Sequence, residues 1–149
     1  MSNPHFETLD GWEAAAQRIG YRPRVPERTA GHALESLSLF VMDHKMREVP
    51  PERRALEAWY GVFSFSQSRP GAAEARRAAL ETSYGSDPRP AEVQGSEART
   101  YERGPELPPD DPDSPMPAVV VWARDEDFFL VASETLAVEE LLVIARSVR

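Results

Sequence analysis

The apolar positions near the N-terminus repeat with the spacing of an amphipathic helix. Between Asp10 and Gly20, the apolar side chains fall at i, i+3, i+4 and i+7 and share one face: Trp12, Ala15, Ala16 and Ile19. Asp10 and Glu13 have the spacing of a capping box, and Gly20 suits the residue after a helix because glycine adopts positive φ easily. We therefore predict a short helix here, preceded by flexible residues 1–8.

The C-terminal residues predict a second amphipathic helix. Thr135 is expected to cap it, Glu139 and Glu140 suit its positive end, and Arg146 suits its negative end. Its apolar residues cover a wide arc: Val138, Leu141, Leu142, Val143, Ile144, Ala145 and Val148. A helix of this kind is buried on more than one side, or it covers a sheet and meets a second surface.

Alternation of apolar and polar positions predicts strands in the middle of the chain. Residues 33–43 alternate in this way, and residues 62–68 place phenylalanines on one face and serines on the other. Residues 53–60 are ambiguous, because the run Glu-Arg-Arg-Ala-Leu-Glu-Ala at 52–58, after Pro51, favours a helix whereas the terminal aromatic pair favours a strand. We interpret residues 53–60 as a strand.

The remaining segments predict one helix, further strands and a long loop. Residues 72–83 are alanine-rich and indicate a thin surface helix, and residues 92–102 indicate a strand with a bulge or turn at Gly95. Residues 116–124 and 128–132 form an antiparallel hairpin around an acidic turn. Residues 104–117 hold six prolines, four acids and no base, which is typical of an exposed, extended loop.

The order of these elements indicates an α+β fold. The connections are too short for repeated β-α-β crossovers, so we expect a curved antiparallel sheet with an N-terminal and a C-terminal helix packed on it. A length of 149 residues fits one domain over residues 1–149.

Packing residues in the final third of the chain resemble a known pattern. They are Trp122, an acidic turn at 125–127, an aromatic strand at 128–131 and a helix at 139–148. This run resembles the ending of an uncharacterised bacterial domain family, which occurs in predicted lipoproteins and in the outer parts of membrane-anchored anti-sigma factors. Residues 20–26, 34–41 and 59–67 are similar to earlier parts of that family. The resemblance implies a curved sheet shaped like lipoprotein-carrier and sigma-regulator sensor domains, and it supplies no catalytic residue.

Charge and composition exclude several classes of function. Seventeen basic and 25 acidic residues give a net charge of −8, which argues against nucleic acid or an anionic membrane as the main partner. The absence of cysteine excludes disulfides and thiolate chemistry. No apolar run approaches the roughly 20 residues that span a bilayer, and the N-terminus is not a signal peptide. We expect a soluble, cytoplasmic chain without membrane insertion; the alternative is an extracytoplasmic fragment of an anchored protein.

No catalytic or metal-binding pattern stands out. His5, His32 and His44 lack the spacing of a zinc site, and the serines lack the G-x-S-x-G elbow of a hydrolase. The acidic cluster at residues 110–113 lacks the glycine and the terminal glutamate of an EF-hand loop. We expect no catalytic residue, no metal and no cofactor, and hence no enzyme; a hydrolase would need His32 or His44 to meet distant carboxylates.

Paired aromatic residues give the most specific indication of function. Trp59 and Tyr60 are adjacent, as are Phe128 and Phe129, so alternation places one ring of each pair outside the core. Together with Trp122 they define a candidate face for a ligand or partner. We expect a non-enzymatic binding or sensing module for a protein partner or a small apolar ligand. The alternative is a self-associating domain that forms a homodimer.

Overall fold

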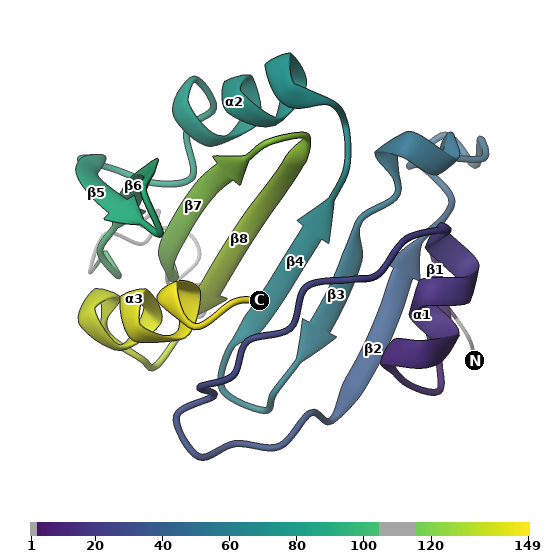
Figure 1. Cartoon of the computed structure of the whole chain (residues 1–149), viewed down its shortest axis with the longest axis horizontal. Helices are drawn as coiled ribbons and strands as arrows, with labels where there is room; N and C mark the ends of the chain where they lie inside the picture. The colour runs from purple at the N-terminus through teal and green to yellow at the C-terminus, as the bar shows by residue number, and fades with distance from the viewer. Residues whose placement is uncertain (1–2, 105–115) are drawn as a thin grey trace, which may run out of the picture.

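The predicted α+β architecture is confirmed. The computed structural model describes residues 3–104 and 116–149, and these form one antiparallel eight-stranded sheet, not closed into a barrel, with three helices (Figure 1). The order across the sheet is β1-β2-β3-β4-β8-β7-β6-β5. The strands are β1 (Phe6–Leu9), β2 (Ser36–Phe40), β3 (Leu56–Trp59), β4 (Ser64–Ser68), β5 (Arg89–Val93), β6 (Ser96–Tyr101), β7 (Ala118–Arg124) and β8 (Asp127–Ser133).

The N-terminal segment is more ordered than the sequence predicted. Residues 6–8, which we expected to be flexible, belong to β1, which pairs with β2. Helix α1 (Trp12–Ile19) starts after Gly11 rather than Asp10, and no side chain caps it. The capping-box prediction is therefore wrong. The expected helix end is confirmed, because Gly20 adopts φ of 84°.

Residues 53–60 contain a strand that is shorter than predicted. A short 3-10 turn, η1 (Pro51–Arg53), precedes β3, so the strand begins only at Leu56. Of the bulge or turn expected at Gly95, the structure has the turn: Gln94 and Gly95 both have positive φ and turn the chain back on itself, so β5 and β6 form a hairpin that begins at Arg89, before the predicted range of 92–102. Most of the expected loop at 104–117 lies outside the described residues.

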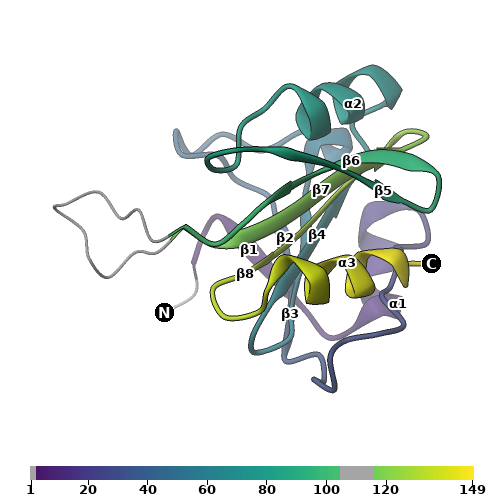
Figure 2. The same cartoon turned by 90° about the vertical axis from the view of Figure 1, so that its left-hand side faces the viewer.

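Two helices cover opposite faces of the β6–β8 half of the sheet (Figure 2). Helix α3 (Val138–Arg146) packs Leu141 and Ile144 into the main core, which also holds Trp122 of β7. Helix α2 (Ala72–Leu80) lies over the other face, where a second cluster contains Val119 and Val121. Because successive strand residues point to opposite faces, β7 is apolar on both.

The start of α3 differs from the sequence prediction. Its first turn follows Ala137, and Thr135 does not cap it. The hydroxyl of Ser133 instead accepts hydrogen bonds from the backbone N–H groups of Thr135 and Leu136. The wide apolar arc is only partly buried, since Ile144 is in the core whereas Val143 is 49% exposed.

The β1–β4 half of the sheet has a covered face and an open face. Its core face bears Leu37, Leu39, Phe63 and Phe65 and packs with α1 in the main core. Residues 21–35 cross that same side of the molecule between α1 and β2 (Figure 1). No described helix lies over the other face of β2–β4, which we call the open face. Among the described residues, no helix is long and apolar enough to cross a membrane.

Candidate functional site

The open face is built from cross-strand rows of small, polar and aromatic side chains. Ser36, Trp59, Ser64 and Ala132 are paired in turn across β2, β3, β4 and β8. A second row runs parallel to it through Ser38, Glu57, Ser66 and Leu130. Residues paired across neighbouring strands point to the same side, so these two rows form a continuous surface.

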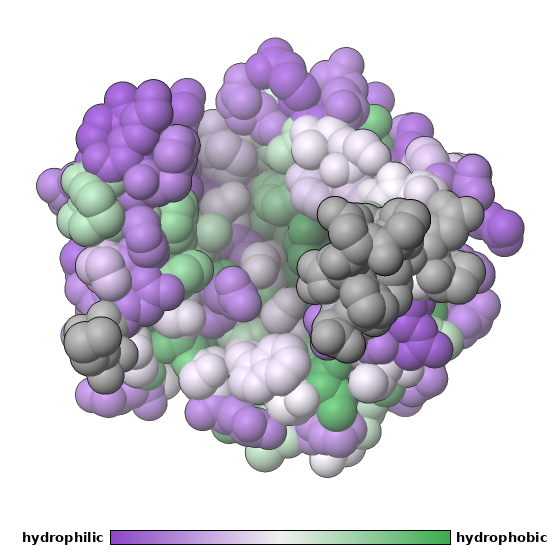
Figure 3. Space-filling view, turned by 180° about the vertical axis from the view of Figure 1, so that it is seen from behind, coloured by the Kyte–Doolittle hydropathy of each residue, from purple (hydrophilic) through white to green (hydrophobic). Residues whose placement is uncertain are grey.

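Small side chains on β4 make the centre of the open face concave. Strand β4 contributes Ser64, Ser66 and Ser68, which are all half-buried. To one side, β8 contributes Phe128, Leu130 and Ala132, which pack into the cluster beneath α2. The space-filling view from this side shows a hollow with apolar residues at its depth (Figure 3). The open face is therefore concave and carries an apolar margin.

A defined hollow of about 440 Å³ lies at the Trp59 end of this face. Its volume falls within the range of small-molecule sites, roughly 300–1,000 Å³. Apolar groups and hydroxyls both line it: Trp59, Gly61, Val62, Ser64, Pro117, Ala132, Ser133, Glu134 and Thr135. We call this feature the Trp59 hollow.

Trp59 and Tyr60 separate onto opposite sides of the sheet, as their adjacency predicted. Trp59 is 41% exposed and lines the hollow. Tyr60 is 3% exposed and stacks on Phe63, with ring centroids 4.6 Å apart. Burial raises the pKa of the Tyr60 phenol to about 12. Tyr60 therefore belongs to the core and not to an exposed binding face.

Phe128 and Phe129 divide in the same way. Phe129 is buried between Phe65 and Trp122, at centroid distances of 6.1 and 5.1 Å. Phe128 is half-buried on the other face, 6.3 Å from the ring of Tyr84. Of the five aromatic residues expected to form one candidate face, Trp59 is the one exposed on the open face. Phe128 is on the same side of the sheet but packs in the cluster beneath α2, and Tyr60, Trp122 and Phe129 lie in the core.

The hydroxyl groups of the hollow have different roles. Ser133 is 3% exposed, and its hydroxyl donates to the Val62 carbonyl at 2.6 Å while accepting from two backbone N–H groups. The hydrogen-bonding capacity of this hydroxyl is therefore used within the protein itself. Ser64 is half-buried, and Glu134 and Thr135 are exposed at the rim, where they present polar groups to the hollow.

Gly61 shapes the turn beside Trp59. Its φ is +87°, in the region that disfavours other residues. The carboxylate of Glu35 occupies the space that a Cβ of residue 61 would need. The Glu35 backbone N–H also donates to the Trp59 carbonyl at 2.8 Å. These contacts fix the backbone that presents the indole ring.

The histidines lie away from the Trp59 hollow. His5 donates from Nδ1 to the Met42 carbonyl at 2.9 Å, and His32 and His44 are in the connections before and after β2. Within residues 3–104 and 116–149, no group of three or more histidines or carboxylates is placed to hold a metal ion. The arrangement of the hollow suits hydrogen bonding and apolar contact.

Sequence reasoning missed most of the residues that line the hollow. Val62, Pro117 and Thr135 come from chain segments outside the strands, and nothing in the linear pattern shows that these segments meet. Ser64 and Ala132 could have been predicted to share a face from strand alternation, but only if the pairing of β4 with β8 had been known. No family model, curated protein or solved structure matches the chain.

Proposed function

We propose that this protein is a binding module that holds a small, largely apolar molecule in the Trp59 hollow. The observation that supports it is an exposed indole that lines a hollow of about 440 Å³, on a sheet face that no helix of the described residues covers. An exposed tryptophan of this kind gains free energy when a ligand removes its ring from water. Ser64 and Thr135 would orient a polar end of the ligand by hydrogen bonding.

The composition of the lining favours a ligand with one polar end. Val62, Pro117 and Ala132 supply apolar contact, whereas Ser64, Thr135 and Glu134 supply polar groups. A ligand with a buried anionic group is disfavoured, because Glu134 is the charged residue of the lining. The hollow therefore suits a neutral or cationic amphipathic molecule.

Titration with N-phenylnaphthylamine, a neutral dye that fluoresces more strongly in apolar surroundings, tests the proposal. We expect saturable binding to the wild-type protein and at least about tenfold weaker binding to Trp59→Ala, the loss expected for one large apolar contact. Ser64→Phe, which fills the hollow, should weaken binding without removing the indole.

Val143→Ala is the matched control. Val143 is 49% exposed on α3, on the other side of the sheet, so its loss removes exposed apolar surface but leaves the hollow intact. Its binding should equal that of the wild type. Equal binding by Trp59→Ala and Ser64→Phe, with both variants folded by circular dichroism, would contradict the proposal.

Self-association through the open face is a second candidate function. The observation that favours it is that Phe6 and Trp59, 36% and 41% exposed, both project from this face. A homodimer would cover both rings in one isologous contact. Sedimentation equilibrium would then show a dimer whose dissociation constant rises in Trp59→Ala, whereas a monomer at all concentrations would exclude it.

A further inference from the structure

Four arginines line a separate pocket on the side of the sheet opposite the open face. The pocket has a volume of about 530 Å³ and brings together Arg22, Arg24, Arg69 and Arg149, beside Tyr21 and Glu27. Its walls come from three distant parts of the chain: the segment after α1, the end of β4 and the segment after α3. We call it the arginine pocket.

This concentration of positive charge contrasts with the rest of the molecule. The chain has a net charge of −8 and only 17 basic residues, yet four of them share this one pocket with a single lining carboxylate, Glu27. Like charges held together raise the free energy of the folded state unless counter-charges offset them. The clustering of four arginines in this pocket is therefore costly to the fold unless negative groups are bound near them.

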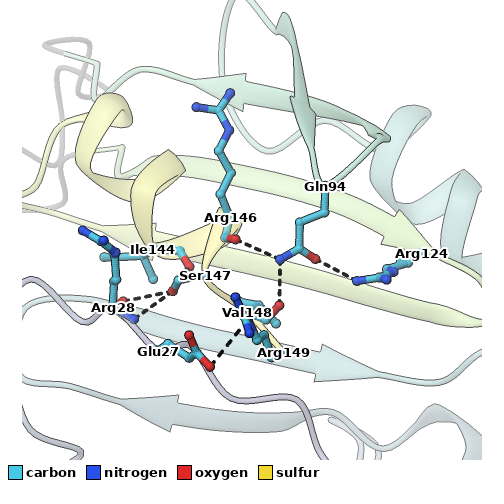
Figure 4. A network of polar contacts seen from close by, with 9 residues as sticks. All are labelled: Glu27, Arg28, Gln94, Arg124, Ile144, Arg146, Ser147, Val148 and Arg149. Carbon is cyan, nitrogen blue, oxygen red and sulfur yellow. Dashed lines mark hydrogen bonds and ion pairs between the residues drawn. The ribbon is translucent and has the colours of Figure 1, made fainter.

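Two of the four guanidinium groups already have partners. Arg69 donates to both carboxylate oxygens of Asp127, at 2.7 and 3.3 Å, and lies 3.8 Å from the centre of the Tyr21 ring. The hydrogen bond that Arg69 donates to Asp127 is the main cause that raises the pKa of Arg69. Arg149 lies 3.5 Å from Glu27 (Figure 4). Arg69 is thus held at the wall of the pocket, whereas the ion pair of Arg149 is exposed to solvent.

The other two guanidinium groups have no such partner in the part of the chain that the structure describes. Arg22 is exposed and Arg24 is half-buried, and neither side chain forms an ion pair or a side-chain hydrogen bond with a residue of 3–104 or 116–149. Each carries N–H donors in a planar fork that matches the oxygens of a carboxylate or phosphate group.

The backbone beneath these arginines is held rigidly. Gln67, a buried residue of β4, accepts from the Arg24 N–H and donates to the Arg24 carbonyl, both at 2.8 Å. Val25 and Arg149 exchange two backbone hydrogen bonds of 3.0 Å each. The backbone from which the Arg24 and Arg149 side chains extend is therefore in place before any ligand arrives, and this lowers the entropy cost of binding.

We propose that the arginine pocket binds the anionic end of a small molecule, a phosphate or carboxylate group, between Arg22 and Arg24, with Arg69 and Arg149 as further positive walls. The pocket is larger than a single oxyanion, so an organic remainder of the ligand can lie beside the Tyr21 ring. This site is on the opposite side of the sheet from the Trp59 hollow and does not depend on the function proposed for it.

Calorimetric titration with two probes, inorganic phosphate and citrate, at constant ionic strength tests the proposal. We expect saturable binding of at least one probe to the wild-type protein. The double variant Arg22→Ala/Arg24→Ala should bind at least about tenfold more weakly, since charge-assisted hydrogen bonds are lost. The probe that binds distinguishes a phosphorylated ligand from a carboxylated one.

Arg76→Ala is the matched control because it removes one exposed arginine from α2, on the other side of the sheet. It should bind the probes as the wild type does. Arg22→Lys/Arg24→Lys keeps the charge without the planar forks and should fall between the wild type and the double alanine variant. Absence of saturable binding of both probes, or equal binding by the folded double alanine variant, would overturn the proposal.

Discussion

Trp59 and Tyr60 are adjacent in the sequence, yet their side chains differ widely in exposure to solvent. The indole faces the open side of the sheet, whereas the phenol is buried against Phe63. Both are large rings with a polar atom, so their different exposures follow from strand alternation alone. The Trp59 ring is thus the one available to a ligand.

The buried phenol of Tyr60 predicts a loss of stability at high pH. Because burial raises its pKa from 10.0 in a free phenol to about 12, the folded state keeps its proton while the unfolded state loses it. The stabilisation is therefore complete below pH 10 and is lost as the pH rises toward 12. Urea unfolding at a series of pH values should show this decline.

Tyr60→Phe provides the control for this prediction. Without the hydroxyl, the decline in unfolding free energy above pH 10 should become shallower. It should not vanish, because burial also raises the pKa values of Tyr21 and Tyr84. An unchanged slope in Tyr60→Phe would show that the phenol does not carry the effect.

Ser133 is expected to contribute more to stability than the other serines near the hollow. Its hydroxyl joins the carbonyl of Val62 to two N–H groups at the start of the connection to α3. Ser133→Ala leaves buried backbone groups unpaired and should lower the free energy of unfolding by about 2 kcal/mol. Ser66→Ala on the open face should change it by less than about 0.5 kcal/mol, and a similar loss in both variants would argue against this role.

At the scale of elements, the segment over residues 21–35 depends on a few polar contacts. It contains no described strand or helix, yet it crosses the sheet and reaches the C-terminal residues (Figures 1 and 4). Pro26 forms an isolated bridge with Val148, and Ser147 bonds the Arg28 N–H at 2.9 Å. Gln67 forms two further hydrogen bonds with the backbone of Arg24, near the start of the segment.

Gln67→Ala should therefore destabilise the protein more than an exposed glutamine does. It removes two hydrogen bonds of a buried amide and leaves the Arg24 backbone without partners, at a cost of about 2 kcal/mol. Gln17→Ala, on the exposed side of α1, should change the free energy of unfolding by less than about 0.5 kcal/mol. Equal free energies for the two variants by chemical denaturation would refute the tethering role of Gln67.

The sequence predicted elements well where the periodicity was local. The β7–β8 hairpin and the strand of Phe63 and Phe65 followed from alternation, and Gly20 ended its helix as expected. The N-terminal strand was missed because β1 has only four residues and gains its stability from pairing with β2. Helix caps were misjudged because Gly11 and Ala137 begin their helices without side-chain caps.

At the scale of the whole molecule, the two halves of the sheet differ in their coverage. Helices cover both faces of the β7–β8 hairpin, whereas the part formed by β2–β4 has no described helix on one side. This asymmetry exposes Trp59 and leaves the serines of β4 at the floor of a concave surface. The linear pattern could not predict it, because the alanine-rich α2 does not reveal which face it covers.

Chemical-shift mapping of the isotope-labelled protein with N-phenylnaphthylamine tests most directly whether the open face binds a ligand. We predict that the largest changes occur in the indole of Trp59 and in the amides of Ser64, Ala132 and Thr135, with little change at Val143 on α3. Changes centred on Val143, with the residues of the Trp59 hollow unaffected, would contradict the account.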